Sequence, residues 1–450
     1  MRRVLLAFGV LLMLTITGCG GSSKSASSTS SSTTKVEPAN ITIWTPFVDP
    51  ELITFKKVVK DFETKNPGIH VKVIGGTNDD KIVAAIRGGN APDVAQSFTS
   101  DNTGVFCPSG AWIDLGSYMQ KDGVKDSIFP AAPRDYSKFE GKRCALPMLA
   151  DAYGLYYNKT LLAKAGYKSP PKTISELTAM AKRLTQRDSS GKLKVVGFNP
   201  FPSWYENVPA HFGPSWGANW VDGGGNSNLN TPAWADQLRW QKSLIDWYGY
   251  DNLVRFNAGA GDEFSASNAF ETGKVAMHMD GEWRVAFLKN EHPELQYGTA
   301  PMPVADGKPQ LYGAGAVNGT IIGIPKGGKH RDAAWALVKY LTTNDHALAK
   351  FSNGIRNVPS TVSSARSPEL IPDKHFSTFI KIFVNKNSQT TPITTIGLDH
   401  LTTFTNFIVK WQAGKVKPQN LVSGLRDVDK QIDAKIKQAN KGGGGGNPVP

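Results

Sequence analysis

Apolar and polar positions alternate, from residue 41 onward, between the spacing of strands and the spacing of helices. Ile41–Trp44 is a short β-type run, and Asp49–Lys65 has its apolar residues on one helix face. Ile69–Ile74 alternates as a strand, and Asp80–Arg87 is a second helix. Another strand follows Ala91-Pro92-Asp93-Val94. This order predicts an α/β fold that begins with parallel strands and helices between them.

The rest of the chain continues with helices and strands. Thr173–Glu176 is a capping box that opens a helix to Arg187, and Thr231-Pro232 opens another helix. Gly197–Gly225, between these two helices, is aromatic-rich and without periodicity, which predicts a long functional loop. The later predicted elements are a helix end at Ser265–Phe270, a strand at Val275–Met279, a strand leading back at Tyr297–Val304, a glycine-rich turn and strand at Gly313–Ile324, a helix at Arg331–Thr342, and helices to about Asn440.

The strand Val275–Met279 ends at Asp280-Gly281, and Trp283 follows two residues later. A buried strand that ends in this way places a flat ring at the carboxyl edge of a sheet, where open α/β sheets hold their ligands. The alternative is a core strand followed by a core tryptophan.

The two ends of the chain differ from its middle. Two arginines, an apolar run and small residues predict a signal peptide at residues 1–18. Ile16-Thr17-Gly18-Cys19 resembles a bacterial lipobox, which implies cleavage before Cys19 and a lipid on its thiol; the alternative is a plain secretory signal. Residues 19–40 contain a Ser/Thr-rich flexible tether, and residues 441–450 form a disordered tail. The folded part is expected to work outside the cytoplasmic membrane.

Cysteine content and charge narrow the function classes. Cys107 and Cys144 are an even pair in an exported chain and are expected to form one disulfide. The formal net charge is +13, but Lys and Arg are scattered without a long basic run. The chain therefore lacks the basic stripe of a nucleic-acid-binding protein.

The sequence contains no catalytic motif that stands on its own. Gly323–His330 is one residue away from a phosphate-binding loop, but His330 replaces the hydroxyl residue that binds magnesium. The histidines are spread singly, so neither a metal nor another cofactor is expected. A glycoside hydrolase remains an alternative, with Asp151, Asp280 and Glu282 as the acids to suspect.

Several aromatic residues lie at strand ends or in irregular stretches rather than on helix faces. A sugar ring stacks its C–H face on a flat aromatic side chain, while carboxylates, amides and arginine bind its hydroxyl groups. Such rings with Asp and Asn nearby suit a carbohydrate site, although each ring is as easily a core residue. The candidates are Trp44, Trp204, Tyr205, Trp216, Trp220 and Trp283.

Four motifs resemble one protein family. The stretch Phe270–Trp283 reads F-x-x-G-K-x-A-M-x-x-x-G-x-W, and N-P-G-I-x-V, A-P-D-V and L-Y-Y-N-K occur earlier. Together they resemble the family-1 extracellular solute-binding proteins, the ligand-capturing components of ABC importers for sugars. The resemblance implies a periplasmic-binding-protein-like fold of two lobes, each a mainly parallel sheet flanked by helices. It also implies a hinge that the chain crosses three times.

The same resemblance implies lobe boundaries and partners. Lobe 1 comprises residues 41–150 and 305–355, and lobe 2 comprises residues 151–304 and 356–440. The expected partners are a sugar or oligosaccharide, permease subunits with a cytoplasmic ATPase, and the membrane through the lipid. The protein is expected to be a monomer and not an enzyme. The alternatives within the binding class are a glycerol phosphodiester and a polyamine.

Ligand contacts follow residue by residue from the matched motifs. Trp283 is the tryptophan of G-x-W and the first choice. Glu282 stands between Gly and Trp, where small or proline residues are common, and is expected to add a polar partner for a hydroxyl group. The other expected contacts are Trp44 after the first strand, Asp151 and Tyr153 before L-Y-Y-N-K, Gly313 and Gly315 in the glycine-rich turn, Arg356 at the third crossing, Phe98 and Asp101 after A-P-D-V as weaker matches, and Trp204 and Trp216 from the aromatic loop.

Overall fold

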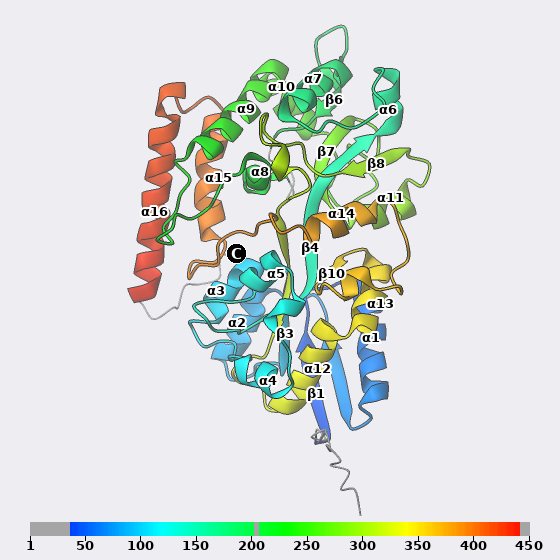
Figure 1. The fold of residues 1–450 in the computed structure, drawn as a ribbon, viewed down its shortest axis with the longest axis vertical. Helices are drawn as coiled ribbons and strands as arrows, with labels where there is room; N and C mark the ends of the chain where they lie inside the picture. The colour runs from blue at the N-terminus through cyan, green and yellow to red at the C-terminus, as the bar shows by residue number, and fades with distance from the viewer. Residues whose placement is uncertain (1–36, 202–206, 442–450) are drawn as a thin grey trace, which may run out of the picture. The chain divides into compact units, whose positions relative to one another are not determined.

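Strand β4 (Leu146–Asn158) is shared by two groups of strands and runs through the middle of the view in Figure 1. Its N-terminal part pairs antiparallel with β9 (Val317–Gly323) and β10 (Val358–Pro359). Its C-terminal part pairs antiparallel with β7 (Val275–Gly281) and β8 (Tyr297–Ala300). We call these groups the first sheet and the second sheet, and β4 belongs to both.

The structure is a computed structural model that describes residues 37–201 and 207–441. Its first sheet has the order β2 (Ile69–Ile74), β1 (Ala39–Trp44), β3 (Val94–Ser97), β9 and β4. Strand β1 is parallel to both of its neighbours, whereas β9 is antiparallel to β3 and to β4. The second sheet continues from β4 through β7 to β6 (Leu193–Phe198) and β5 (Gln186–Arg187).

The α/β class is confirmed, but the prediction of mainly parallel sheets is wrong. Among the described strands only the pairs β1–β2, β1–β3 and β6–β7 are parallel. The other pairs are antiparallel, since β4 and β9 run against the strands that they join and β5 and β6 form a hairpin. The sequence pattern reports the spacing within a strand and not its direction, so alternating helices and strands suggested parallel pairing throughout.

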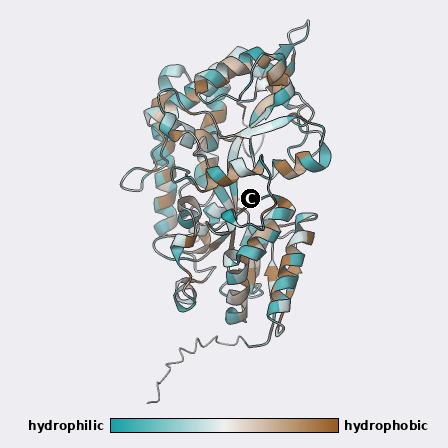
Figure 2. Ribbon diagram, turned by 45° about the vertical axis from the view of Figure 1, so that its right-hand side comes forward, coloured by the Kyte–Doolittle hydropathy of each residue, from teal (hydrophilic) through white to brown (hydrophobic). Residues whose placement is uncertain are grey.

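Helices pack against the first sheet through apolar faces. Helix α1 (Glu51–Lys65) buries Phe55, Val58, Val59 and Phe62, which recur at helical spacing. Figure 2 shows the resulting change between hydrophobic and hydrophilic positions along such helices. The other helices of this part are α2 (Asp79–Arg87), α3 (Thr103–Phe106), α4 (Gly116–Lys121), α5 (Ala131–Tyr136), α12 (Arg331–Thr343) and α13 (Asp345–Ile355).

A second set of helices surrounds β6, β7 and β8. Three of them form a separate apolar cluster, in which the indole of Trp234 is fully buried beside Phe404 and Leu425. These are α9 (Pro232–Tyr248), α15 (Asp399–Gln412) and α16 (Leu421–Lys441). The others are α6 (Lys159–Lys164), α7 (Ile174–Leu184), α8 (Pro209–Trp216), α10 (Tyr250–Asn257), α11 (Arg284–Glu291) and α14 (Phe376–Phe383). Short 3₁₀ helices lie at Ser100–Asn102, Asp126–Ile128, Pro309–Leu311, Ser364–Arg366 and Pro418–Asn420.

Local signals predicted many of these elements, and the structure differs from the prediction at several places. The capping box is present, since Thr173 Oγ1 accepts from the amide of Glu176 and the Glu176 carboxylate accepts from the amide of Thr173, each at 3.3 Å. Its helix ends at Leu184 instead of Arg187, because the next residues pair as β5. Ser265–Phe270 forms turns instead of a helix end. The aromatic loop contains the unpredicted helix α8, which has prolines at its first position and inside it.

A disulfide joins Cys107, directly after α3, to Cys144, just before β4, and the two Cα atoms are 5.4 Å apart. Both residues are buried. Cys19, the predicted signal peptide and most of the tether lie outside the described residues, as does the tail after Lys441. Within the described ranges, no helix has the length and apolar composition that a membrane crossing requires.

Candidate functional site

The indole of Trp283 lies directly over the end of β7. A Cβ atom on Gly281 would come within 2.3 Å of the indole ring, so the glycine of G-x-W is required by the position of this ring. Only 9% of the Trp283 surface is exposed, and its Nε1–H has no hydrogen-bond partner among the described residues. The ring edge faces Tyr153 of β4, with centroids 5.9 Å apart and planes at 87°. Two of the predicted contacts are therefore neighbours in space.

Tyr153 connects this pair to helix α8. Its ring stacks on the imidazole of His211, with centroids 4.0 Å apart and planes at 16°. The Nε2 atom of His211 is 3.4 Å from Nδ2 of Asn318 on β9. Tyr153 is fully buried, so the tyrosine packs between Trp283 and His211 instead of presenting an open face.

The residue between Gly281 and Trp283 binds the backbone of two other strands. The carboxylate of Glu282 is fully buried and accepts a hydrogen bond from the amide of Ala152 at 2.8 Å. It also accepts from Nδ2 of Asn357 at 3.0 Å and from the amide of Val358. Glu282 thus contacts β4 and β10 from the end of β7, and these contacts were not predicted.

Three carboxyl groups gather around this point. The Nδ2 atom of Asn357 also donates to Oδ1 of Asp151 at 2.8 Å, so one amide group bridges Asp151 and Glu282. Burial raises the pKa of Asp151 to about 7, although the hydrogen bond from Asn357 opposes the change. Burial and the nearby Asp151 raise the pKa of Glu51, at the start of α1, to about 7. Burial and Asp151 also raise the pKa of Glu282 well above its usual range. The cluster therefore holds protons near neutral pH and can both donate and accept hydrogen bonds.

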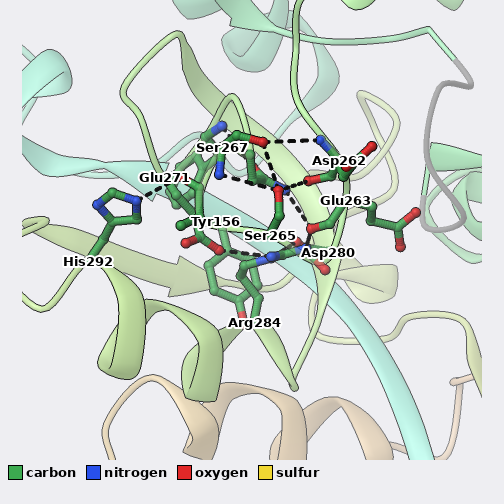
Figure 3. Close-up of polar contacts among 12 residues, drawn as sticks. Tyr156, Asp262, Glu263, Ser265, Ser267, Glu271, Asp280, Arg284 and His292 are labelled. Carbon is green, nitrogen blue, oxygen red and sulfur yellow. Dashed lines mark hydrogen bonds and ion pairs between the residues drawn. The ribbon is translucent and has the colours of Figure 1, made fainter. Parts of the chain in front are cut away.

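Behind Trp283, a buried arginine fixes the turn from which the indole projects. Figure 3 shows Arg284 between Asp280 and Glu271, with the turn that contains Glu263 beside it. Arg284 Nε lies 2.6 Å from Asp280 Oδ2, and Nη1 lies 2.8 Å from Glu271 Oε1. Its Nη2 donates to the carbonyl of Glu263 at 2.6 Å. These charge-assisted bonds hold the segment before β7 against the end of the strand.

His278 of β7 is fully buried near this ion pair. Its ring stacks on Phe270 with centroids 4.5 Å apart, and Nε2 is 3.6 Å from Oδ2 of Asp280. Burial lowers the pKa of His278 to about 4, although the Asp280 carboxylate opposes the change. The imidazole is therefore neutral at physiological pH.

The glycine-rich turn packs against the same region. Gly313 has a φ of +99°, a conformation that side chains disfavour. A Cβ atom on Gly315 would lie 2.9 Å from the carbonyl oxygen of Tyr153, so glycine permits the close approach to β4. The Gly315 amide donates to the hydroxyl of Ser388 at 3.1 Å. The turn lies beside Tyr153, and this amide is engaged within the protein.

Two of the predicted contacts are engaged elsewhere. Arg356 is buried in a left-handed conformation at the end of α13, donates to the carbonyl of Ile371 at 3.2 Å, and lies over the ring of Phe376. Asp101 is buried and accepts from the hydroxyl of Thr391 at 2.7 Å, with His400 Nε2 at 3.6 Å. These contacts stabilise the fold around each residue.

The remaining aromatic candidates differ in exposure. Phe98 is 45% exposed, and its ring edge packs on the buried Phe47 with centroids 5.2 Å apart. Trp44 and Trp216 are half-buried at the ends of β1 and α8. Trp204 and its neighbour Tyr205 lie outside the described residues. Phe98 is therefore the candidate ring with the most accessible surface among those described.

Three unpredicted residues lie beside the predicted ones: Glu51, His211 and Asn357. An acidic residue in the first turn of the helix after the first strand was a usable signal for Glu51. Asn357 follows Arg356 directly in the predicted third crossing, so its place was known but not its role. His211 had no signal, because α8 itself was unexpected. Among residues 37–201 and 207–441, no three His, Cys, Asp or Glu side chains are placed to hold a metal ion.

Known proteins match this chain over most of its length. The family described as bacterial extracellular solute-binding protein matches residues 57–378, which is more than half of the chain. The chain belongs to this family. A Brucella abortus protein named as a binding protein is 26% identical over 390 residues, 85% of this chain and 90% of that protein. The maltotriose-binding protein of Pyrococcus abyssi is 22% identical over 340 residues, 74% of this chain and 69% of that protein.

A solved structure has the same fold as this chain. CpMnBP1 with mannotriose bound is 28% identical to this chain and has a TM-score of 0.75, covering 87% of this chain and 99% of that chain. The prediction of a two-lobed, periplasmic-binding-protein-like fold is thereby confirmed. Membership of an extracellular solute-binding family also confirms the predicted family and the extracytoplasmic location. The family is described as one of binding proteins and not as a family of enzymes.

Proposed function

We propose that this solute-binding protein captures a sugar or short oligosaccharide and delivers it to the permease of an ABC importer. The observation that carries this proposal is the contact of Trp283 with Tyr153 beside the carboxyl groups of Asp151 and Glu282. A sugar needs a flat ring for its C–H face and hydrogen-bonding groups for its hydroxyls. The exposed ring of Phe98, which follows β3 of the first sheet, supplies a second stacking surface.

The relatives support a carbohydrate as the ligand. The similar proteins include one named for maltotriose and one solved with mannotriose. Both sugars are neutral oligosaccharides, and neither the exposed Phe98 nor the Asp151–Glu282 pair calls for a charged ligand.

We propose that the ligand lies between two lobes that close over it. Lobe 1 would comprise residues 41–150 and 305–355, and lobe 2 would comprise residues 151–304 and 356–440. The pairing of β4 with strands of both sheets supports a boundary near Asp151. Contacts made only in the closed form would shift the population toward closure when the sugar binds.

Attachment to the membrane is part of the same proposal. Cleavage before Cys19 and a lipid on its thiol would anchor a monomer through a flexible tether on the outer face of the cytoplasmic membrane. The lipobox-like residues before Cys19 and the Ser/Thr-rich composition after it support this arrangement. Loss of labelling by a fatty-acid probe in a Cys19→Ala variant would be the expected result, and labelling that persisted would contradict it.

A polyamine is the alternative ligand that the acidic side chains suggest, and it is included in the test. Three acidic side chains, Glu51, Asp151 and Glu282, lie near one another, and a polyamine prefers a site lined by acids. Their raised pKa values mean that the cluster carries fewer than three charges near neutral pH, which suits hydroxyl groups better than ammonium groups.

A binding and cleavage screen tests the proposal. The purified protein without its signal peptide would be incubated with mannobiose, mannotriose, maltotriose or spermidine. Each mixture would be analysed for products by chromatography, and its melting temperature would be measured by heating. A higher melting temperature with a sugar, and an unchanged sugar afterward, is the expected result. A shift with spermidine alone would favour the polyamine alternative. Cleavage products would identify a glycoside hydrolase.

A further inference from the structure

Glu282 joins three segments that are far apart in the sequence. It follows β7 directly, it accepts from the amide of Ala152 in β4, and it accepts from the amide of Val358 in β10. Ala152 and Glu282 are 130 residues apart in the chain. Because Val358 also pairs with Ala150, one carboxylate binds two adjacent strands of the first sheet.

The same carboxylate shares a hydrogen-bond donor with Asp151. Oε1 of Glu282 and Oδ1 of Asp151 both lie within 3.0 Å of the single Nδ2 atom of Asn357. Asp151 is half-buried, whereas Glu282 has no exposed surface. Asp151 is therefore the member of the pair with exposed surface. Glu282 lies in the interior and is connected to Asp151 through the side-chain amide of Asn357.

We propose that Glu282 is a positioning residue that fastens β4 and β10 to the turn carrying Trp283, and thereby holds Asp151 and Trp283 in one geometry for sugar binding. This inference rests on the proposed function. It goes beyond that function by giving a role to the glutamate that stands between the glycine and the tryptophan of G-x-W. Its carboxylate links the candidate site to β4 and β10.

The acidic groups around Glu282 make its contribution to folding stability depend on pH. The groups that face the cluster are Asp151 from β4, Glu51 from α1, Tyr136 from α5 and Tyr156 from β4, and each of them is acidic or neutral. A buried carboxyl among such neighbours binds its proton more tightly in the folded than in the unfolded chain. The contribution of Glu282 to folding stability therefore falls as the pH rises from about 4.5 through neutrality, and replacing this ionisable group removes that contribution.

Two substitutions separate the hydrogen bonds of Glu282 from its charge. Glu282→Gln keeps one side-chain oxygen, which can accept from the Ala152 amide, and Glu282→Ala removes both acceptor oxygens. Glu63→Gln is the matched control, because Glu63 also accepts a backbone amide, from Val71 at 2.8 Å, in a helix remote from Trp283. Glu282→Asp serves where the alanine variant does not fold, because its shorter side chain fails to reach both strands.

Three measurements apply to each variant. Amide hydrogen exchange at Ala152 and Val358 reports the two hydrogen bonds without any sugar. Melting temperatures from pH 5 to pH 8 report the charge. Calorimetric titration with mannobiose, mannotriose and maltotriose at a temperature where every variant is folded reports the effect on binding.

We expect at least tenfold faster exchange at both amides in Glu282→Ala, and at least tenfold weaker sugar binding. Glu282→Gln should show slower exchange at Ala152 and tighter binding than Glu282→Ala. The melting temperature of Glu282→Gln relative to the unsubstituted protein should increase with pH, and that of Glu63→Gln should not. Unchanged exchange, or unchanged sugar affinity in the folded alanine or aspartate variant, would overturn the inference. If none of the sugars binds the unsubstituted protein, the proposed function fails, whereas hydrogen exchange still decides whether Glu282 holds the two strands.

Discussion

The Nε atom of Arg284 lies 2.6 Å from Oδ2 of Asp280, and neither side chain has appreciable exposed surface. Glu271 completes the ion-pair group at 2.8 Å from Nη1 of the same arginine. The two partners come from opposite ends of β7, one before the strand and one within its last residues. Arg284 therefore links the turn before β7 to the turn that bears Trp283.

Removal of this arginine is expected to destabilise the protein strongly. Arg284→Met should lower the free energy of unfolding by about 3–5 kcal/mol, because two buried carboxylates lose their cation. Urea unfolding followed by circular dichroism measures the change. Arg239→Met is the control, since Arg239 pairs with Asp236 on an exposed helix face and should lose no more than about 1 kcal/mol. Equal losses for the two variants would show that the buried group contributes no more than a surface pair.

The disulfide is expected to contribute a further large share of the stability. Cys107 and Cys144 are 37 residues apart, and a covalent link over a loop of that length restricts the unfolded chain by about 4 kcal/mol. The variant with alanine at both positions should therefore unfold at a lower guanidinium concentration than the oxidised protein. Dithiothreitol should lower the midpoint of the unsubstituted protein and leave that of the double variant unchanged. A midpoint that dithiothreitol shifts equally in both proteins would contradict this assignment.

The sequence predicted elements whose signals lie within a few neighbouring residues. The strand Ile69–Ile74 and the capping box at Thr173–Glu176 are examples, because alternation and capping are local properties. The matched motifs also named Trp283 and Tyr153 as separate candidate contacts, and the structure places the two rings side by side. Helix α8 was missed because its prolines and glycine resemble those of a loop.

The polar part of the candidate site could not be predicted in the same way. The hydrogen bond from Asn357 to Asp151 joins residues 206 positions apart, and the bond from Ala152 to Glu282 joins residues 130 positions apart. Such contacts depend on the register of β4 against its neighbours, which no local spacing encodes. Asp101 shows the converse: it lies next to a recognised motif, but its carboxylate binds Thr391 within the protein. Sequence motifs located the strand ends, and long-range packing decided which side chains meet there.

His278 is expected to make the protein less stable in acid. Its pKa is about 4 in the folded chain and about 6.5 when the imidazole is exposed to water, so the unfolded chain binds more protons between these values. The free energy of unfolding should therefore fall as the pH drops from about 6.5 to 4, by on the order of 3 kcal/mol from this residue alone. The raised pKa values of Asp151 and Glu51 act in the opposite direction, so the effect is measured as a difference between variants.

The informative variant is His278→Phe, which keeps an aromatic ring beside Phe270 but does not titrate. Its melting temperature relative to the unsubstituted protein should increase as the pH is lowered from 7 to 4. His346→Gln is the control, because the side chain of His346 is 50% exposed on α13. The same pH profile for all three proteins would contradict the assignment of the acid sensitivity to His278.

Trp283 provides the most direct test of the candidate binding site. Its indole is the predicted stacking surface, and alanine would remove both the ring and its packing against Tyr153. Affinity for whichever of mannobiose, mannotriose and maltotriose stabilises the protein should fall roughly 10- to 100-fold, as is usual when a buried aromatic contact is removed. Phe98→Ala should weaken binding less, because 45% of that side chain is already exposed to water.

Trp247→Ala distinguishes a binding effect from the general cost of removing a tryptophan. Trp247 is 39% exposed on α9 and packs beneath Lys182 and Arg187, on a helix that contributes none of the candidate contacts. Its loss should leave calorimetric affinity within about twofold of the unsubstituted value, because no ligand contact is removed. Full affinity in Trp283→Ala, together with a native circular dichroism spectrum, would place the ligand away from the end of β7. Equal weakening by Trp283→Ala and Trp247→Ala would instead trace the loss to stability, because Trp247 contacts Lys182 and Arg187 and none of the candidate residues.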